Sequence, residues 1–589
     1  MNTNYSELEK IRLGSALLLG MAISRLYPDA QFGGFDLTEE GFYYDFKFTG
    51  EGVTEYELPS IEEEINGLIE KDLQFRFSQK SKQEAMDFYA AINQPFKLES
   101  LEDIRLPKLG FVTIGDNGYN DIIKQLPIRS TKEAGIVKVL SVAGAYWKGD
   151  ENRPMLTRIY ATSYPSREEL DLFNENKEEA QRRDHRVLGK KLGIYMTDQS
   201  VGSGLIVWEP RGAFIKHQLE RFIYDAYLDN GFMPLDTPTI SLKEIYEESG
   251  HIDSYKDMMF GPWKEDETEE YYVKPMNYPM HMLAFNSKVR SYRDLPWRTM
   301  EMGDVFRYEK SSDLHGLLKA RGFTKDDCYT ICSREQLEAE MESQFNLMLF
   351  MLRSFGLNDF EVALNNKMPK KIKNEGFDSE WDLAVSVLRN VVRKAGYNLK
   401  ETDVPSIFYG PKVEIILRDS LKRHRNLSAL ALDVVTPKRM ELEYTGKDGL
   451  QHLPYVIHRS IFGSFERFIG ILLEHTAGNL PLWLQYEKCR IVPVNSKNEY
   501  YAETLMRKCR EAGIVTKVDY SNEPLEGKIK QAEEDKIPYI LVVGEKEQRV
   551  NGVAVRVQGT GDLGLVIFDN FLASIMEEIK TKSIKTLLI

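Results

Sequence analysis

The spacing of hydrophobic residues changes along the chain and predicts folding units of different kinds. An apolar run over 14–27 predicts a helix, alternation over 41–48 predicts a strand, and a polar stretch over 166–183 predicts a long surface helix. Residues 1–182 are therefore predicted to form a mixed α/β unit, followed by a charged linker helix over 183–210.

A second unit is predicted over 211–482. It opens with a helix whose apolar positions share one face and which ends at Gly231. Residues 274–470 contain short β-like runs and close with the helical segment ERFIGILLEHTAG. We expect an α+β domain with six or seven antiparallel strands and helices packed on the sheet.

After Pro481 strands and helices alternate strictly, from CRIVPV to a final helix near residues 569–580. This alternation predicts a smaller α/β domain over 483–589. A chain of 589 residues is long enough for three or four such units.

Composition narrows the class of protein. No apolar run approaches the roughly 18 residues that span a bilayer, and the polar N-terminus shows no secretory signal. The four cysteines form no CxxC pair, which favours a reducing cytoplasm over a disulfide scaffold. A net charge of −14 argues against general coating of DNA but permits a local basic face. We therefore expect a cytoplasmic protein with no membrane or DNA partner.

The segment RTMEMGDVFRYEKSSDLHGLLKARGFTKDD carries the first candidate chemistry. Arg307 and Glu309 are predicted on one face of a strand, with Arg321 on the next strand. Such side chains can bind phosphate oxygens and an adenine amino group, although a lone R-x-E is more often a surface ion pair. The segment GSFERFIG favours the nucleotide site, because Ser464 precedes a predicted helix and Arg467 is placed to stack on a purine.

These stretches resemble motifs 2 and 3 of class II aminoacyl-tRNA synthetases, and GFMPLDTPTI with Pro238 resembles the dimer-forming motif 1. The resemblance is closest to threonyl-tRNA synthetases and extends from about residue 10 to the C-terminus. It is carried by the segments SGHIDSYKDMMF, KPMN, SYRDLPWR, LHGLLKARGFT, FYGPKVE, IHRSIFGSFERFIGIL and AGAYWKGD.

The resemblance implies ATP and Mg²⁺ as ligands and assigns roles to the matching residues. Arg307 would bind the α-phosphate and the amino-acid carboxylate, Glu309 the adenine, and Arg467 would stack on it. The phosphate and magnesium side would use Lys412 and Glu414. The α-amino group would be held by Tyr409 and Asp327, and His251 would lie near the terminal ribose of tRNA.

The C-terminal domain resembles the family's anticodon-binding domain. Asn522, Glu547 and Arg556 match its base-reading residues, and Lys530 stands where arginine is usual. Forked polar side chains suit the reading of bases splayed out of single-stranded RNA, whereas the plainer interpretation is a solvated polar face. The implied partners are a threonine-type tRNA, an amino acid, ATP and a second copy of the chain.

The chain departs from the family at the zinc site, where a cysteine and two histidines bind the metal. Tyr278 replaces the cysteine, Met280 a nearby glycine and Tyr329 the first histidine, so only His458 remains. One ligand cannot hold a zinc site, so we expect no zinc. Cys328 is expected to face away from the lost site, since neighbouring residues of a strand face opposite sides.

Lys325 replaces the family's glutamine and is expected to pair with Asp327 or with an acidic group of the substrate or tRNA. The N-terminal unit resembles the family's editing domain, but its four catalytic positions hold apolar residues, namely Leu13, Leu17, Ile123 and Pro127. Apolar side chains cannot activate water, so editing is expected to be absent.

The first hypothesis is therefore a ligase that forms an aminoacyl-adenylate and charges a threonine-type tRNA, with changed amino-acid specificity and no editing. Three alternatives remain: zinc-free threonylation, a tRNA-binding or regulatory paralogue without ligase activity, and an adenylating ligase with a non-tRNA acceptor.

Overall fold

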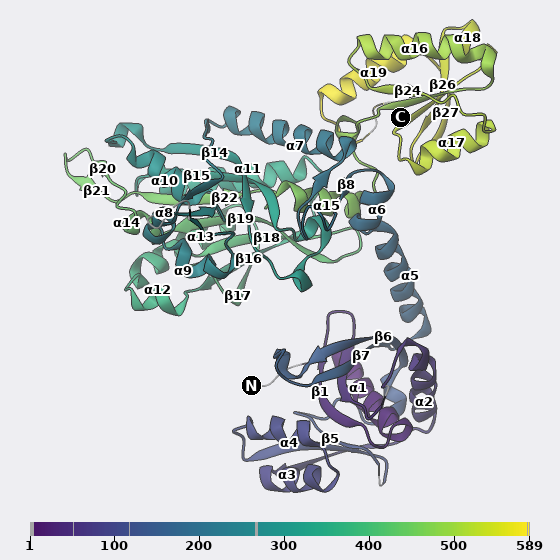
Figure 1. Ribbon diagram of the computed structural model, residues 1–589, viewed down its shortest axis with the longest axis vertical. Helices are drawn as coiled ribbons and strands as arrows, with labels where there is room; N and C mark the ends of the chain where they lie inside the picture. Colours follow the sequence, from purple (N-terminus) through teal and green to yellow (C-terminus); the bar gives the residue numbers. More distant parts are fainter. Residues whose placement is uncertain (1–4, 51, 117, 265–268, 586, 588–589) are drawn as a thin grey trace. The chain divides into compact units, whose positions relative to one another are not determined.

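The computed structural model describes residues 5–50, 52–116, 118–264, 269–585 and 587. The chain divides into two compact units, Met1–Glu178 and Glu179–Ile589, whose elements are labelled in Figure 1. Within the described residues, no helix combines the length and apolarity needed to cross a membrane.

The first unit contains a four-stranded antiparallel sheet, order β1-β2-β7-β6, and a three-stranded sheet, order β3-β4-β5. Its strands are β1 (Gln31–Leu37), β2 (Phe42–Lys47), β3 (Phe75–Ser81), β4 (Lys108–Ile114), β5 (Asn120–Ile122), β6 (Ile136–Tyr146) and β7 (Met155–Tyr164). Its helices are α1 (Glu7–Leu26), α2 (Leu58–Glu70), α3 (Lys82–Ala91) and α4 (Pro95–Glu102). The apolar middle of α1 packs against the larger sheet and forms the core of this unit. The predicted helix over 14–27 and strand over 41–48 are thus confirmed.

Helix α5 (Arg167–Arg183) leaves the first unit and confirms the predicted polar helix. Residues 183–210, however, were predicted as one linker helix, and this is wrong. After α5 they hold a short helix, α6 (His185–Lys191), and a hairpin, β8 (Tyr195–Met196) with β9 (Val207–Trp208). Gly193 has a φ of +61°, a left-handed conformation that stops a helix at this point.

The second unit is built on an eight-stranded sheet of order β10-β14-β15-β22-β19-β18-β16-β17. The strands, in sheet order, are Met233–Pro234, Trp297–Phe306, Gly322–Cys332, Tyr455–Ser460, His424–Asp433, Lys412–Arg418, Phe360–Lys367 and Leu399–Pro405. The inner six strands are antiparallel as predicted, but both edge strands pair in parallel. The predicted count of six or seven missed this, because β10 has only two residues and β17 follows β16 through a helical crossover.

Helices cover this sheet and bury its core. The longer ones are α7 (Pro210–Asp229), α10 (Tyr278–Asn286), α11 (Leu337–Arg353), α13 (Asp378–Lys394) and α15 (Phe465–Thr476). The short ones are α8 (Lys243–Glu248), α9 (His251–Tyr255), α12 (Lys370–Asn374) and α14 (Thr436–Arg439). Small strands lie beside them: β11 (Ile240–Leu242), β12 (Trp263–Lys264), β13 (Glu270–Val273), β20 (Tyr444–Thr445) and β21 (Gln451–His452).

The C-terminal part of the second unit has a five-stranded sheet of order β24-β23-β25-β26-β27. Its strands are β23 (Cys489–Pro493), β24 (Thr516–Val518), β25 (Tyr539–Val543), β26 (Gly552–Val557) and β27 (Gly561–Ile567), and its helices are α16 (Glu499–Glu511), α17 (Leu525–Glu534), α18 (Glu545–Arg549) and α19 (Phe568–Lys580). The predicted alternation of strands and helices is confirmed as far as β26, but it is not strict, because β27 follows β26 directly and pairs with it antiparallel.

Candidate active site

Two antiparallel strands, β14 and β15, begin the site. Arg307 and Glu309 were predicted on one face of a strand, and this is wrong, because β14 ends at Phe306. Both residues instead start the loop that leads to β15. The Arg307 amide still donates to the carbonyl of Arg321 at 2.8 Å, and this hydrogen bond joins the two ends of the loop.

The Arg307 side chain is held from two directions. Its Nε donates to the carbonyl of Pro275 at 3.2 Å, and its guanidinium lies 5.2 Å from the ring centroid of Tyr255 and 5.5 Å from that of Phe323. These contacts leave the terminal nitrogens of Arg307 for an anionic ligand. An arginine fixed in this way suits a phosphate or carboxylate without further ordering.

The loop that follows contains Glu309, whose carboxylate accepts from Lys319 at 3.1 Å. Arg321 was predicted on the second strand, and this is wrong, because β15 begins at Gly322. The Nε of Arg321 donates to the Glu309 carbonyl at 2.9 Å. The guanidinium of Arg321 also lies over the ring of Tyr308, with 4.4 Å to the centroid. The three residues predicted as one nucleotide-binding group therefore do lie together.

Arg467 lies in the first turn of α15. Ser464 caps this helix, since its hydroxyl accepts from the Arg467 amide at 3.0 Å. The guanidinium donates from Nε to the carbonyl of Asn426 at 2.7 Å and from Nη1 to that of Leu318 at 2.9 Å. Burial lowers the pKa of Arg467, and the two carbonyls keep its plane in one orientation.

Lys412 and Glu414 lie on β18, two residues apart and hence on one face. Their side chains pair at 2.6 Å, and the Glu414 carboxylate also accepts from the Asn365 side chain at 2.6 Å. The Glu414 carboxylate is thus partly buried but held by neutral and positive partners.

The expected amino-acid pocket is a buried aromatic cluster of Tyr278, Tyr329, Tyr409 and His458. Tyr278 stacks on Tyr409 with ring centroids 5.3 Å apart and meets Tyr329 edge-on at 5.0 Å. Tyr329 is nearly parallel to His458, with an interplanar angle of 13° and centroids 4.9 Å apart. Two tyrosines at the replaced positions therefore pack around the remaining histidine.

The hydrogen bonds of this cluster leave no donor set for zinc. The Tyr409 hydroxyl donates to His458 Nδ1 at 2.8 Å, and His458 Nε2 donates to Asp327 at 3.0 Å, so both ring nitrogens are used. The Tyr278 hydroxyl donates to Asp433, and burial raises the pKa of that carboxyl to about 6. Burial also holds the pKa values of Tyr278 and Tyr329 well above their usual range, so both stay neutral. The residues present do not fit a zinc ion.

Lys325 pairs with Asp327 at 2.9 Å, which is the first of the two partners expected for Lys325. Asp327 also accepts from the Asn277 side chain at 3.0 Å. Burial alone would raise the pKa of Asp327, but the Lys325 ammonium and the His458 hydrogen bond hold it far below its usual range. The group expected to bind the substrate's α-amino group thus already carries an ammonium partner.

His251 begins α9 and is fully buried. Its Nδ1 contacts the Ser249 hydroxyl at 2.9 Å, and its ring meets Phe408 edge-on at 5.0 Å. Burial lowers the pKa of His251 to about 3, so the ring is neutral at physiological pH.

Three buried polar atoms around this cluster have no hydrogen-bond partner among the described residues: His251 Nε2, Asn277 Oδ1 and the Tyr329 hydroxyl. Buried polar groups normally have partners, so unpaired atoms around one cluster indicate a place where a ligand completes the hydrogen bonding.

Cys328 faces the other side of β15, as expected. Its sulfur accepts from Arg459 at 3.1 Å, and burial raises its pKa to about 11. A neutral thiol on the opposite face cannot serve as a metal ligand beside His458.

The four editing-type positions of the first unit, Leu13, Leu17, Ile123 and Pro127, are buried. A polar network lies near them in the sequence, around Asp121. This carboxylate accepts from Lys97 at 2.7 and 2.9 Å and from the hydroxyls of Tyr44, Tyr89 and Tyr119. Its oxygens are occupied, so Asp121 is poorly placed to take a proton from water.

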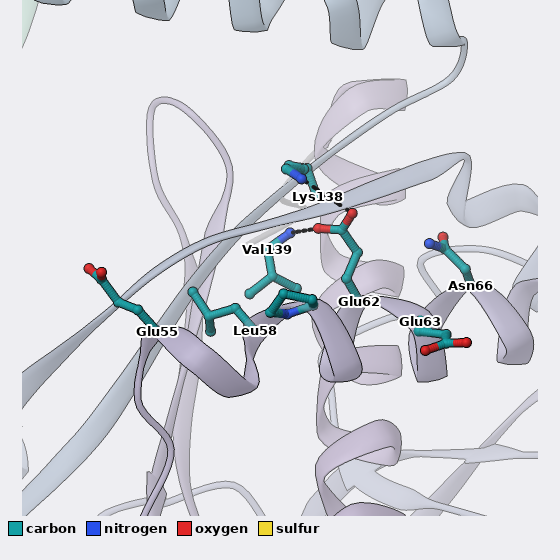
Figure 2. A pocket seen from close by; sticks show the side chains of 8 residues that line it. Glu55, Leu58, Glu62, Glu63, Asn66, Lys138 and Val139 are labelled. Atoms are coloured by element: carbon teal, nitrogen blue, oxygen red, sulfur yellow. Dashed lines mark hydrogen bonds and ion pairs between the residues drawn. The ribbon is translucent and has the colours of Figure 1, made fainter.

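The first unit also has an open depression of about 370 Å³ between α2 and β6 (Figure 2). Glu62 ties the two elements together, since its carboxylate accepts from the Val139 amide at 2.9 Å. None of the four editing-type positions lines this depression.

The predicted anticodon residues lie on several different elements of the C-terminal domain. Asn522 is exposed in the loop before α17, and Lys530 is exposed on α17. Arg556, on β26, lies 3.8 Å from Glu533 of the same helix. Glu547 instead caps its own helix by accepting from the Gly544 amide at 3.0 Å. Arg556 is therefore beside α17, whereas in the described part of the chain no hydrogen bond or ion pair joins Glu547 to the other three.

Glu466, next to Arg467, gives a pH-dependent prediction. Burial raises its pKa to about 7, against roughly 4.3 in an unfolded chain. A raised pKa means that the stability linked to this proton is present below about pH 4 and is lost as pH rises through 7. The free energy of unfolding of Glu466→Gln, minus that of the wild type, should therefore rise by on the order of 3 kcal/mol from pH 4.5 to pH 8. Urea unfolding at both pH values measures this, and an unchanged difference would refute it.

Sequence reasoning missed two residues of the pocket. Asn277 lay within the quoted segment KPMN, which was a signal that could have found it. Asp433, the partner of Tyr278, lies 155 residues away in sequence and had no local signal.

Residues 262–476 match the family model described as the tRNA synthetase class II core domain (G, H, P, S and T), and residues 488–578 match the anticodon binding domain. The chain is 38% identical to the threonine–tRNA ligase of Aquifex aeolicus, covering 98% of this chain and 90% of that protein. It is also 38% identical to that of a Sulfurihydrogenibium species, covering 98% and 89%.

Among solved structures, it resembles the RNA binding domain of threonyl-tRNA synthetase from Cryptosporidium parvum, with a TM-score of 0.62 and 31% identity. That match covers 69% of this chain and 100% of the other. A putative threonyl-tRNA synthetase from Aeropyrum pernix matches with a TM-score of 0.59 and 25% identity, covering 69% and 98%.

Proposed function

Because the chain belongs to the threonine–tRNA ligase family of class II synthetases, we propose that it forms an aminoacyl-adenylate from ATP and transfers it to a threonine-type tRNA. We further propose that it does so without zinc, without editing and with an amino acid other than threonine. The observation that carries the proposal is the contrast between two parts of one site. The arginines expected to bind ATP are held in place, whereas the metal position holds two buried tyrosines.

Adenylate formation requires neutralisation of charge at the phosphates more than it requires a covalent nucleophile. Arg307 would bind the α-phosphate and the attacking carboxylate with its terminal nitrogens, since its Nε is already committed to Pro275. Arg467 would stack on the adenine ring, and Glu309 would accept a hydrogen bond from the adenine amino group. Glu414 would hold Mg²⁺, which neutralises phosphate charge when bound.

The aromatic cluster supports the proposed change of specificity. A metal that grips the amino and hydroxyl groups rejects wrong amino acids strongly, whereas an apolar wall separates them only weakly. Here the Tyr329 hydroxyl and Asn277 Oδ1 are unpaired polar atoms in the described structure. A substrate able to hydrogen-bond with them would be selected on different grounds from threonine.

The absence of editing is proposed for a related reason. The four positions that would activate water are buried and apolar, and Asp121 already accepts from Lys97 and three tyrosines.

A second copy of the chain is proposed to dock at the segment around Pro238, where Met233, Ile240 and Leu242 expose large apolar side chains.

The test is aminoacylation with Mg²⁺, ATP, total tRNA and all proteinogenic amino acids, followed by mass spectrometry of the terminal adenosine. A tRNA carrying a residue other than threonine is the expected result. Threonine on the tRNA would reject the change of specificity, and an uncharged tRNA would reject the proposed ligation by this route.

Lys325→Gln provides a sharper test of the pocket. Without the ammonium, Asp327 keeps only the Asn277 and His458 hydrogen bonds, so the α-amino group gains a better partner. We expect the amino-acid KM to fall roughly tenfold, because one charge-assisted contact contributes about 1.5–3 kcal/mol. The ATP KM should stay within about twofold of the wild-type value. A change in the ATP KM alone would contradict this assignment.

A further inference from the structure

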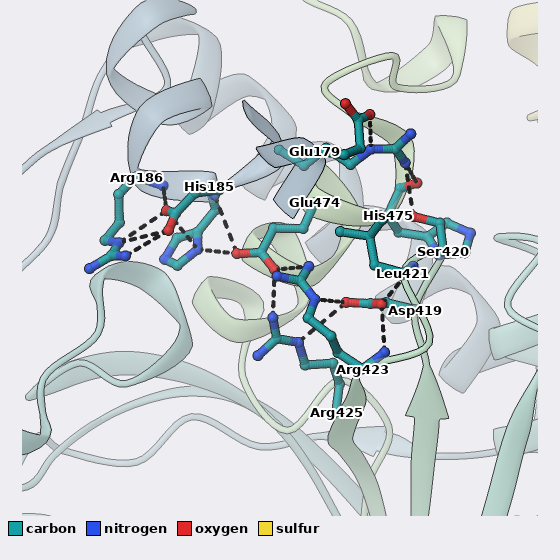
Figure 3. A network of polar contacts seen from close by, with 12 residues as sticks. Glu179, His185, Arg186, Asp419, Ser420, Leu421, Arg423, Arg425, Glu474 and His475 are labelled. Carbon is teal, nitrogen blue, oxygen red and sulfur yellow. Dashed lines mark hydrogen bonds and ion pairs between the residues drawn. The ribbon is translucent and has the colours of Figure 1, made fainter. Parts of the chain in front are cut away.

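His185 is a buried histidine outside the residues expected to touch substrate. It lies where α6, the loop 316–318 and α15 meet. Figure 3 shows its ring pointing toward Glu474 of α15, which in turn faces Arg423 and Arg425.

Both ring nitrogens of His185 are used. Nε2 accepts from the Leu317 amide at 3.1 Å, so it carries no proton, and Nδ1 donates to Glu474 Oε1 at 2.7 Å. The second oxygen of Glu474 accepts from Arg423 at 2.6 Å and from Arg425 at 2.7 Å. We call His185 and Glu474, with these partners, the His185 hub.

The hub does not resemble a metal site, although ligand atoms of Asp184, His185 and Glu474 lie within 4.8 Å of one another. His185 has no free lone pair, because Nε2 is occupied by an amide. Asp184 accepts from Arg186 at 2.6 Å, and Glu474 accepts from two arginines. The positive charge that a cation would supply is already present in these side chains.

The loop fits closely between its two neighbours. A Cβ on Gly316 would lie 2.5 Å from His185 Nε2, and Gly316 has a φ of +49°, so only glycine fits there. On the other side, a Cβ on Gly470 of α15 would lie 3.2 Å from the Leu317 side chain. The loop is therefore clamped between α6 and α15.

Each carbonyl that orients Arg467 is one residue away from a group held by the hub. Leu318, whose carbonyl accepts from Arg467 Nη1, follows Leu317, which is bonded to His185. Asn426, whose carbonyl accepts from Arg467 Nε, follows Arg425, which is bonded to Glu474. Two connections, which we call arms, therefore join the hub to the Arg467 guanidinium. One arm runs through Leu317 and Leu318 of the loop, and the other runs through Arg425 and Asn426 of β19.

We propose that His185 is a positioning residue for ATP binding: through the Leu317 amide it fixes the Leu318 carbonyl, one of the two that hold Arg467 over the adenine. The Asn426 carbonyl is fixed through Arg425 and Glu474, and Glu474 keeps both arginine partners even without the His185 donor. This inference rests on the proposed role of Arg467. It adds a requirement that lies in α6, the first helix that belongs wholly to the second unit.

The test uses the full chain with Mg²⁺ and three probes: ATP, AMP and inorganic tripolyphosphate, each titrated by calorimetry. Asparagine places its amide nitrogen near Nδ1, and glutamine places its amide oxygen near Nε2. His185→Asn therefore keeps the donor to Glu474 but loses the acceptor for Leu317, whereas His185→Gln keeps the acceptor. His185→Asn should weaken ATP and AMP binding about fivefold to tenfold, His185→Gln less than about threefold, and tripolyphosphate binding should not change.

His217→Asn is the matched control, because His217 is an exposed histidine on α7, and it should bind all three probes like the wild type. Arg425→Gln cuts the other arm and should also weaken ATP and AMP but not tripolyphosphate, so it decides the matter alone if His185→Asn does not fold. Equal losses in His185→Asn and His185→Gln, or an equal loss of tripolyphosphate, would overturn the inference. A wild type that binds no ATP would instead refute the proposed function.

Discussion

Replacing Arg307 with alanine is expected to lower kcat/KM for adenylate formation by about two to three orders of magnitude. The guanidinium is anchored through Nε to Pro275 and is flanked by Tyr255 and Phe323, so its terminal nitrogens face a ligand without having to be ordered first. Losing it removes charge neutralisation where negative charge accumulates in the transition state. ATP–pyrophosphate exchange, with the amino acid identified by aminoacylation, measures the effect.

Arg221→Ala is the control for Arg307→Ala. Arg221 is an exposed arginine on α7, 4.0 Å from Asp225, and its loss should leave exchange within about twofold of the wild type. An Arg307→Ala protein that exchanged pyrophosphate at the wild-type rate would remove Arg307 from the mechanism.

The second large effect is expected from Tyr278→Cys combined with Tyr329→His. Each change restores a metal-binding side chain beside His458, and three such ligands are enough for a zinc site with one open position. We expect the double variant to bind zinc more than about a thousandfold more tightly than the wild type. Without metal it should be less stable than the wild type by several kcal/mol, because one buried phenol ring is lost and the other is replaced by a smaller imidazole.

The Tm of this double variant should therefore fall on chelation and recover with added zinc, since binding to the folded state alone stabilises it. The single variants serve as controls, because two ligands do not complete the site. A wild type that loses Tm on chelation as strongly as the double variant would show that our account of the tyrosines is incorrect.

The fold could be predicted from the sequence where a pattern is local. The helical periodicity of residues 211–229 predicted α7, and the alternation after Pro481 predicted the C-terminal domain, although β26 and β27 follow one another without a helix between them. Edge strands were harder, because β10 has only two residues and its parallel pairing with β14 depends on a distant segment. The linker prediction was incorrect because it continued a charged helical pattern past Gly193.

The candidate site could be predicted only in part. The residues expected to face a ligand lay in segments with a recognisable spacing, and the structure brings Arg307, Glu309 and Arg321 together even though all three lie outside β14 and β15. The partners that orient such residues come from elsewhere in the chain. Asp433 reaches Tyr278 from another strand, and His185 reaches Leu317 from the linker, so neither contact had a local pattern.

The retained and lost features follow one physical division. Groups that we propose to neutralise phosphate charge or orient adenine have fixed hydrogen-bond partners, including both carbonyls at Arg467. Groups that would hold a metal at the amino acid are replaced by neutral, buried phenols. This division is what selection for adenylation without recognition of threonine by zinc would produce.

The most direct measurement is amino-acid-dependent ATP–pyrophosphate exchange on protein that has been treated with a chelator and desalted, with its zinc content determined on the same sample. Our account predicts full exchange without zinc, supported by an amino acid other than threonine. Exchange with threonine that is abolished by the chelator and restored by one zinc per chain would contradict it.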